Sequence, residues 1–166
     1  MSEPMQPSLR TIRIWLTIFI VGLILSGVTA FPLVHETAWM ASFLAAHPIL
    51  PHGIILWIKR VHQALLDDSI RAPFLAYGTD WLAFAHLVLA VAFIGPFLDP
   101  IRNKWVLQFG IIACIGVLPL AFIAGPIRGI PLPWRLIDSS FGIFGAIPLL
   151  ICLRHIKHLE RVDNAD

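Results

Sequence analysis

Four long apolar runs constrain the fold of this chain more than any other feature of its sequence. The runs cover residues 14–31, 81–98, 105–124 and 134–153. Each is close to the roughly 20 residues that an α-helix needs to cross about 30 Å of hydrocarbon. Only 13% of the 166 residues are charged, which is too little to cover the surface of a soluble domain of this length. The sequence therefore predicts an all-α integral membrane protein, a four-transmembrane-helix bundle in which residues 1–166 form a single membrane domain.

Each apolar run begins beside a tryptophan, and indole rings favour the headgroup layer at the edge of a bilayer. The four residues are Trp15, Trp81, Trp105 and Trp134. The first run follows two arginines and resembles a signal peptide, but it is longer than the roughly 7–15 apolar residues of a signal-peptide core. We therefore expect the first run to be a membrane anchor.

Proline, glycine and other small residues predict where these helices are interrupted or packed closely. The Gly95-Pro96 pair predicts a loosened or terminated second helix, and Pro119 predicts a kink in the third. Small residues four positions apart allow two helices to approach closely. Two such pairs are Gly22 with Ser26 and Gly142 with Ala146.

Lysine and arginine set the expected orientation in the membrane. One set lies in the two tails and in the turn at residues 99–104: Arg10, Arg13, Arg102, Lys104, Arg154, Lys157 and Arg161. The other set is spread over much more chain: Lys59, Arg60, Arg71, Arg128 and Arg135. Because basic residues concentrate on the cytoplasmic side, both termini are expected in the cytoplasm. The absence of eukaryotic-style targeting signals favours a bacterial inner (cytoplasmic) membrane.

The long segment between the first two apolar runs does not resemble a soluble loop. In residues 53–66, apolar residues recur at helical spacing while charged residues cover the other side; the apolar set is Ile54, Ile58, Val61 and Leu65. In residues 34–46, Trp39 and Phe43 lie one turn apart, and the helix-breaking residues 47–53 separate the two stretches. The sequence predicts one or two short amphipathic interfacial helices here, lying over the outer face of the membrane.

Ionisable residues inside or beside the spans are the candidates for function, because they are costly in a membrane. Arg135, Asp138 and Ser139 share one face at the start of the fourth run, since residues three and four apart are neighbours on a helix. Arg128, in the preceding loop, presents a second guanidinium, and Tyr77 is a further candidate binding residue. One interpretation is that the two arginines bind a phosphate or carboxylate headgroup. The other is an Arg135–Asp138 ion pair that only fixes helix packing.

Asp80, His86 and Glu36 are the candidates for proton transfer. Asp80 precedes the second run, where it is expected to cap the helix N-terminus; alternatively it is a base or a counter-ion for one of the arginines. His86 lies about 9 Å deeper along the same helix. It could hydrogen-bond a neighbouring helix, relay protons, or ligate haem or a metal.

Metal and haem are the less favoured alternatives. His35 and His62 lie in the segment between the first two runs and are, with His86, the histidines considered as metal ligands. Their spacing matches no metal-binding motif, so no metal site is predicted. No other predicted span contains a histidine that could pair with His86 around a haem. The sequence thus leaves the cofactor, if any, unidentified.

The chain carries no familiar catalytic motif and no nucleic-acid signature. The favoured interpretation is a non-catalytic accessory or structural subunit of a larger membrane complex. Its partners would be the lipid bilayer and either another membrane protein or further copies of itself. The alternative is a small membrane enzyme that acts on a lipid or isoprenoid substrate at the outer rim. A haem- or metal-binding electron-transfer protein or a transporter is the third interpretation.

Overall fold

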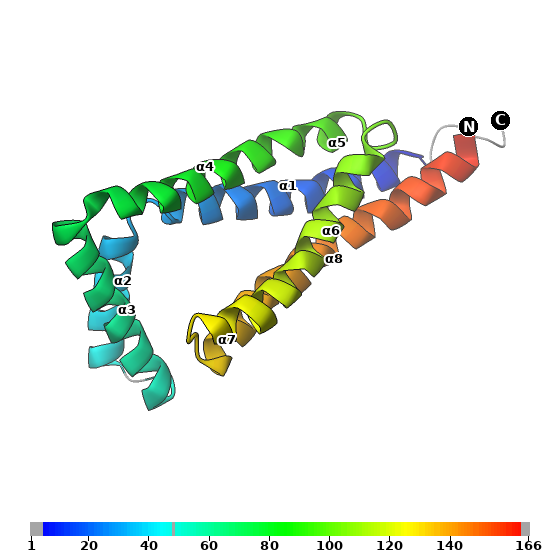
Figure 1. Ribbon diagram of the computed structural model, residues 1–166. Helices are drawn as coiled ribbons and strands as arrows, with labels where there is room; N and C mark the ends of the chain where they lie inside the picture. Colours follow the sequence, from blue (N-terminus) through cyan, green and yellow to red (C-terminus); the bar gives the residue numbers. More distant parts are fainter. Residues whose placement is uncertain (1–4, 48, 164–166) are drawn as a thin grey trace. The chain divides into compact units, whose positions relative to one another are not determined.

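The computed structural model describes residues 5–47 and 49–163, and the regular secondary structure in these residues is entirely helical (Figure 1). Within them, four helical segments are long and apolar enough to cross a membrane: Ser8–Thr29, Pro73–Leu98, Lys104–Ile127 and Leu132–Arg161. The predicted all-helical class and the four long apolar segments are therefore confirmed. Pro48, in the turn predicted at residues 47–53, lies outside the described residues.

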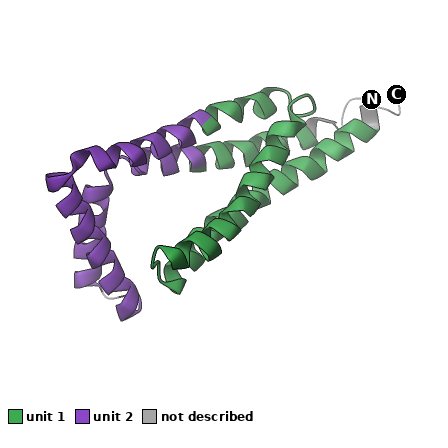
Figure 2. Ribbon diagram, in the orientation of Figure 1, with its two compact units in different colours: residues 1–22, 89–166 green, residues 23–88 purple. Residues whose placement is uncertain are grey.

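The chain divides into two compact units, which Figure 2 colours separately. Residues 23–88 form one unit, and residues 1–22 together with 89–166 form the other. Helices α1 (Met5–Thr29) and α4 (Ala76–Ala92) contribute to both units. The last two long apolar segments, by contrast, belong entirely to the unit of residues 1–22 and 89–166.

In the unit formed by residues 23–88, α2 (Leu33–Ala46) and α3 (His52–Arg71) lie side by side (Figure 1). Both short helices predicted for this segment form, and the second continues beyond residue 66 to Arg71. Leu44 of α2 and Ile55 and Ile58 of α3 are buried. The amphipathic pattern predicted for both helices is found in α3 alone, because large apolar side chains such as Trp39 and Phe43 also occupy the exposed side of α2. The Thr37 hydroxyl lies 3.1 Å from Nδ1 of His62 and joins the two helices through a hydrogen bond.

Helix α4 begins at Ala76 rather than beside Trp81, where the apolar run starts. The 3₁₀ turn η1 (Pro73–Leu75) leads directly into it. A proline is favoured at the first position of a helix, because its missing N–H would have no partner there. Asp80 consequently lies inside the helix, and its predicted role as the N-cap is wrong: the free amides of the first turn are several residues away.

Helix α4 ends at Ala92, and the short helix α5 (Ile94–Leu98) follows, which confirms the interruption predicted at Gly95-Pro96. The break falls at Ala92 because Pro96 has no N–H to donate to the carbonyl group four residues before it. Nδ2 of Asn103 then donates a hydrogen bond of 3.2 Å to the carbonyl oxygen of Gly95. This bond ties the end of α5 to the turn that enters the next helix.

The remaining helices are α6 (Lys104–Pro119), the π-helical turn η2 (Leu120–Ala124), α7 (Gly125–Ile127) and α8 (Leu132–Asp163). A kink was predicted at Pro119, and the structure places the π-helical turn directly after it. In this turn the N–H of Gly125 donates to the carbonyl oxygen of Leu120, five residues earlier. Prolines at 119 and 126 both remove donors from the α-helical ladder here, so the regular pattern cannot continue.

Helices α6 and α8 lie side by side and run in opposite directions (Figure 1). At one end, Nζ of Lys104 forms an ion pair of 2.7 Å with Glu160. Between the ends, a Cβ on Gly142 would lie only 2.5 Å from the carbonyl oxygen of Cys114. The close-packing role predicted for Gly142 is confirmed, because only a residue without a side chain leaves room for this approach.

The corresponding expectation for Gly22 has a different outcome. A Cβ at Gly22 would meet nothing within 4 Å, whereas one at Gly27 would lie 2.9 Å from the carbonyl oxygen of Ala83. The contact of α1 with α4 in the unit of residues 23–88 therefore uses Gly27. Gly22 and Ser26 are both exposed, so the close packing predicted for this pair is not found among the described residues.

The core of the other unit lies where α1, α5, α6 and α8 come together. Its fully buried side chains include Ile12, Leu16, Phe93, Leu107, Leu149, Cys152 and Ile156. The rings of Phe19 and Phe93 pack with their centroids 4.6 Å apart. The Cys152 thiol lies 3.6 Å from the carbonyl oxygen of Ile12. This packing fixes one end of the α6–α8 pair and leaves the opposite end to form the site described next.

Candidate functional site

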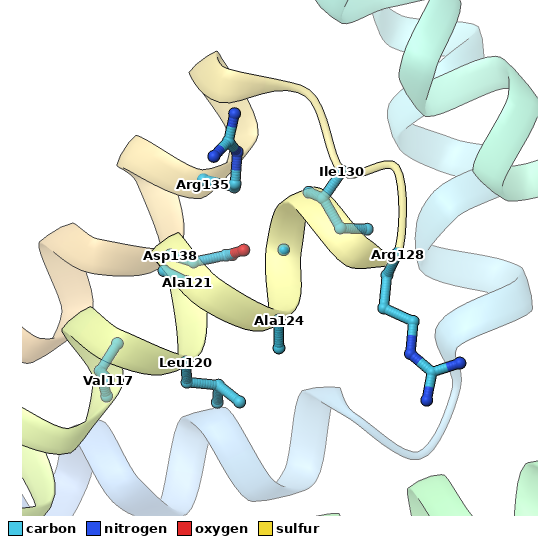
Figure 3. Close-up of a pocket in the computed structure, with 9 residues that line it drawn as sticks. Val117, Leu120, Ala121, Ala124, Arg128, Ile130, Arg135 and Asp138 are labelled. Atoms are coloured by element: carbon cyan, nitrogen blue, oxygen red, sulfur yellow. The ribbon is translucent and has the colours of Figure 1, made fainter.

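The end of α6, η2, α7 and the start of α8 line an open pocket with a volume of about 260 Å³ (Figure 3). Its lining residues are Val117, Leu120, Ala121, Ala124, Gly125, Arg128, Ile130, Arg135 and Asp138. Most of this lining is apolar, and three of its side chains are ionisable. A mainly apolar pocket whose lining includes a few polar groups is a candidate ligand site.

Arg135 is held in the pocket by its aliphatic stem. A Cβ on Gly125 would lie 2.5 Å from Cδ of Arg135 and 3.0 Å from its Cγ, so the stem packs directly against the glycine backbone. The Nε atom of Arg135 is buried and has no hydrogen-bond partner among the described residues. A buried donor of this kind costs free energy until an acceptor reaches it.

Asp138 lines the same pocket one helical turn farther along α8. It is partly buried, and Figure 3 shows its carboxylate pointing toward the neighbouring η2–α7 segment. Within residues 5–47 and 49–163 it forms no ion pair with Arg135, so the packing ion pair considered from the sequence is not present. The cause is the contact with Gly125, which holds the stem of Arg135 while the guanidinium extends toward the start of α8 (Figure 3).

Arg128 lies at the mouth of the pocket. Its side chain is exposed, and its guanidinium extends away from Arg135 and Asp138 (Figure 3). The loop that carries it is closed by backbone bonds: the N–H of Ile130 donates to the carbonyl oxygen of Gly125 at 2.9 Å. Gly129 has a φ of 70°, a left-handed conformation that favours glycine. The two arginines therefore line one pocket without converging on one point.

Ser139 was a candidate binding residue, but its hydroxyl is already engaged. The residue is buried, and its Oγ donates a hydrogen bond of 2.7 Å to the carbonyl oxygen of Arg135. Serine hydroxyls in helices commonly bond to the carbonyl group four residues earlier. Ser139 thus belongs to the wall behind the pocket and does not line it.

The candidates for proton transfer lie in the unit of residues 23–88, whereas the lining comes from residues 117–138. Nδ1 of His86 is 2.8 Å from the carbonyl oxygen of Leu82, on its own helix. Asp80 lies within α4, and Glu36 lies in the first turn of α2, where the positive end of the helix dipole stabilises a negative charge. Tyr77 is exposed and packs edge-on against Trp81, with centroids 6.0 Å apart.

The histidines considered as metal ligands are not part of a cluster of potential ligands in the described residues. His62 bonds to Thr37, His35 is exposed, and no group of three or more His, Cys, Asp or Glu side chains is assembled within the described chain. The fourth long apolar segment reaches Arg161 and so includes His155 and His158. The end predicted at residue 153 had left both histidines outside every span.

Sequence reasoning identified Arg128, Arg135 and Asp138 but missed the pocket that they line. The contact between Gly125 and Arg135 joins residues ten positions apart across a loop, and helical periodicity does not report it. The available signal was the cluster of Pro119, Gly125 and Pro126, which marks a break in regular helix beside two arginines.

No protein-family model matches the sequence, and comparisons with curated proteins and with solved structures also found no match. The pocket residues themselves are therefore the basis for assigning a function.

Proposed function

We propose that this protein crosses a bacterial inner membrane as a bundle of four helices and binds the anionic headgroup of a lipid or isoprenoid amphiphile in the α6–α8 pocket. One observation carries the proposal: Arg135 lines a pocket with mainly apolar walls, and its guanidinium has a buried Nε without a hydrogen-bond partner among the described residues. Guanidinium binds phosphate and carboxylate with paired hydrogen bonds. An anionic group at this position would supply the missing acceptor.

The dimensions of α8 support this placement of the pocket. At 1.5 Å per residue, Arg135 and Glu160 lie roughly 38 Å apart along the helix. A bilayer is about 40–45 Å thick when its headgroup layers are included. The Lys104–Glu160 ion pair and the pocket would then lie in opposite headgroup layers. With both termini in the cytoplasm, the pocket would face outward and α2 and α3 would lie in the outer interface.

The walls of the pocket suit an amphiphile better than a free anion. Leu120, Ala121 and Ala124 line the side formed by η2, and Leu120 is 66% exposed, so an apolar chain could continue from the headgroup along this surface. Arg128 at the mouth is free to turn toward a bound anion, because its exposed side chain has room to change rotamer. It would add a second positive charge.

We propose binding without turnover as the role of the site. Asp138 is the one group among the lining residues that could accept a proton at neutral pH, and no serine, cysteine or histidine of the described chain lines the pocket beside it. The enzyme interpretation needs Asp80, His86 or Glu36 as an acid or base. None of these three residues is part of the pocket lining, so the lining itself supports headgroup binding.

Truncation of Arg135 tests the proposal. We expect Arg135→Ala to weaken binding of dioleoyl phosphatidylglycerol about 10- to 100-fold, the loss expected for a charge-assisted hydrogen bond of roughly 1.5–3 kcal/mol. Native mass spectrometry of the protein in detergent, titrated with the lipid, measures the bound fraction.

Two controls define the result. Arg71→Ala removes an exposed arginine at the end of α3 and is expected to leave lipid binding unchanged. Dioleoylglycerol has the same chains and no phosphate, and it is expected to bind weakly to every variant. Equal loss of phosphatidylglycerol binding in the Arg71 and Arg135 variants would show that only general surface charge is involved.

A second candidate function is that of an accessory subunit in a larger membrane complex. The exposed pair of Gly22 and Ser26 favours it, because a Cβ at Gly22 would meet nothing within 4 Å and small residues at such spacing allow a second helix to approach. We expect Gly22→Leu to preserve folding of the isolated chain and to remove a stoichiometric protein partner from native mass spectra of gently extracted protein. A partner that survives this substitution would exclude this face of α1 as the contact.

A further inference from the structure

We infer that the ligand of the α6–α8 pocket carries a hydroxyl or ammonium group next to its anionic group, and that Asp138 accepts a hydrogen bond from this donor. The inference rests on the proposed headgroup binding and specifies the chemistry of the headgroup. It follows from the arrangement of Asp138 and Arg135, which present an acceptor and a donor to the same small pocket.

The carboxylate of Asp138 is available to a ligand. The residue lines the pocket and is partly buried, and in the described residues it takes part in no hydrogen bond or ion pair. Figure 3 shows the carboxylate directed toward the η2–α7 side of the pocket. Arg135 lines the same pocket and forms no ion pair with this carboxylate.

The charge on Asp138 selects against a simple anion. Asp138 and Arg135 line the same small pocket, so an anion bound at Arg135 would share this pocket with the carboxylate. Two like charges in one small pocket repel each other, and burial strengthens the repulsion. A headgroup with a hydroxyl or ammonium group beside its phosphate replaces this repulsion with a hydrogen bond.

The volume of the open pocket suits a small headgroup. A volume of about 260 Å³ falls below the roughly 300–1,000 Å³ of sites that enclose a whole drug-sized molecule. A phosphate with one short polar substituent fits this volume, and the acyl chains would remain outside. Glycerol and ethanolamine phosphodiesters have this chemistry, whether they occur as lipid headgroups or as soluble esters.

Two lipids of equal charge test the inference. Dioleoyl phosphatidylglycerol and dioleoyl phosphatidylmethanol both carry one negative charge and the same chains, but only the first has free hydroxyl groups. We expect the wild-type protein to prefer phosphatidylglycerol about tenfold, as expected for one added hydrogen bond to a charged group. We expect Asp138→Ala to bind phosphatidylmethanol more tightly than wild type and to lose the preference, while its melting temperature confirms that it is folded.

The outcomes separate this inference from the proposed function. Equal binding of the two lipids by wild type, unchanged in Asp138→Ala, would overturn the inference while headgroup binding that depends on Arg135 still stands. Absence of any binding that depends on Arg135 would overturn the proposed function itself. Competition by free glycerophosphoglycerol, a soluble phosphodiester, assigns the ligand to the soluble esters, and lack of competition assigns it to the lipids. A preference that depends on Asp138 supports the inference in either case.

Discussion

Gly142→Ala is expected to lower the stability of the protein by about 1–3 kcal/mol, the usual cost of forcing an extra group into a well-packed contact. The new Cβ would lie 2.5 Å from the carbonyl oxygen of Cys114 and 3.2 Å from Cβ of Val117. A backbone oxygen cannot rotate away as the end of a flexible side chain can. Helix α8 would therefore have to move away from α6 along their shared contact.

Gly116→Ala on α6 is the matched control, because a Cβ at this position meets nothing within 4 Å. Alanine lowers the conformational entropy of the unfolded chain, so this variant is expected to be as stable as wild type or more stable, by up to about 1 kcal/mol. Thermal unfolding of both variants in one detergent, followed by tryptophan fluorescence, measures the difference. Identical melting temperatures would mean that α6 and α8 are not in close contact at Gly142.

The second large effect is expected at the pocket, from a substitution that removes no charge. Gly125→Ala places a Cβ 2.5 Å from Cδ of Arg135 and 3.0 Å from its Cγ. These atoms lie in the middle of the arginine side chain, so the whole stem has to leave its position. We expect phosphatidylglycerol binding to fall about as far as in Arg135→Ala, roughly 10- to 100-fold.

Lipid titrations of Gly125→Ala and Gly116→Ala, followed by native mass spectrometry, provide the comparison. Each variant adds one methyl group to a glycine, at Gly125 in α7 or at Gly116 in α6, but only the methyl group at Gly125 would contact Arg135. Retained binding in Gly125→Ala would show that the guanidinium reaches the anion without the support of the glycine. Lost binding in both variants would indicate a general disturbance of α6.

The apolar runs were sufficient to predict four long helices, yet the ends of these helices depend on other residues. Helix α4 starts early because Pro73 begins a 3₁₀ turn that leads into it. Helix α8 continues to Asp163 because its last turns are amphipathic: Ile156 and Leu159 are buried while Lys157 is exposed. A window that measures hydrophobicity ends where the helix stops being uniformly apolar, which is not where the helix itself ends.

In the candidate site, too, relations within one helix could be predicted from the sequence, whereas contacts across the loop could not. Arg135 and Asp138 could be placed on one face from their spacing alone, because that relation lies within one helix. Their lack of an ion pair could not be predicted, since it depends on Gly125 and on the loop that returns the chain to α8. The wide separation of the Arg128 and Arg135 guanidinium groups is also a property of this loop (Figure 3).

The shape of the pocket depends on the number of residues in the π-helical turn η2. A π-helical turn contains one residue more than an α-helical turn, and one residue corresponds to a rotation of about 100° around the helix axis. Helix α7, which follows η2 directly, is consequently rotated by that angle relative to the phase of α6. Deleting a single residue from η2 would restore the α-helical phase and turn Gly125 away from Arg135. A variant of this chain with one residue deleted from η2 is therefore expected to keep the four long helices and to lose the pocket.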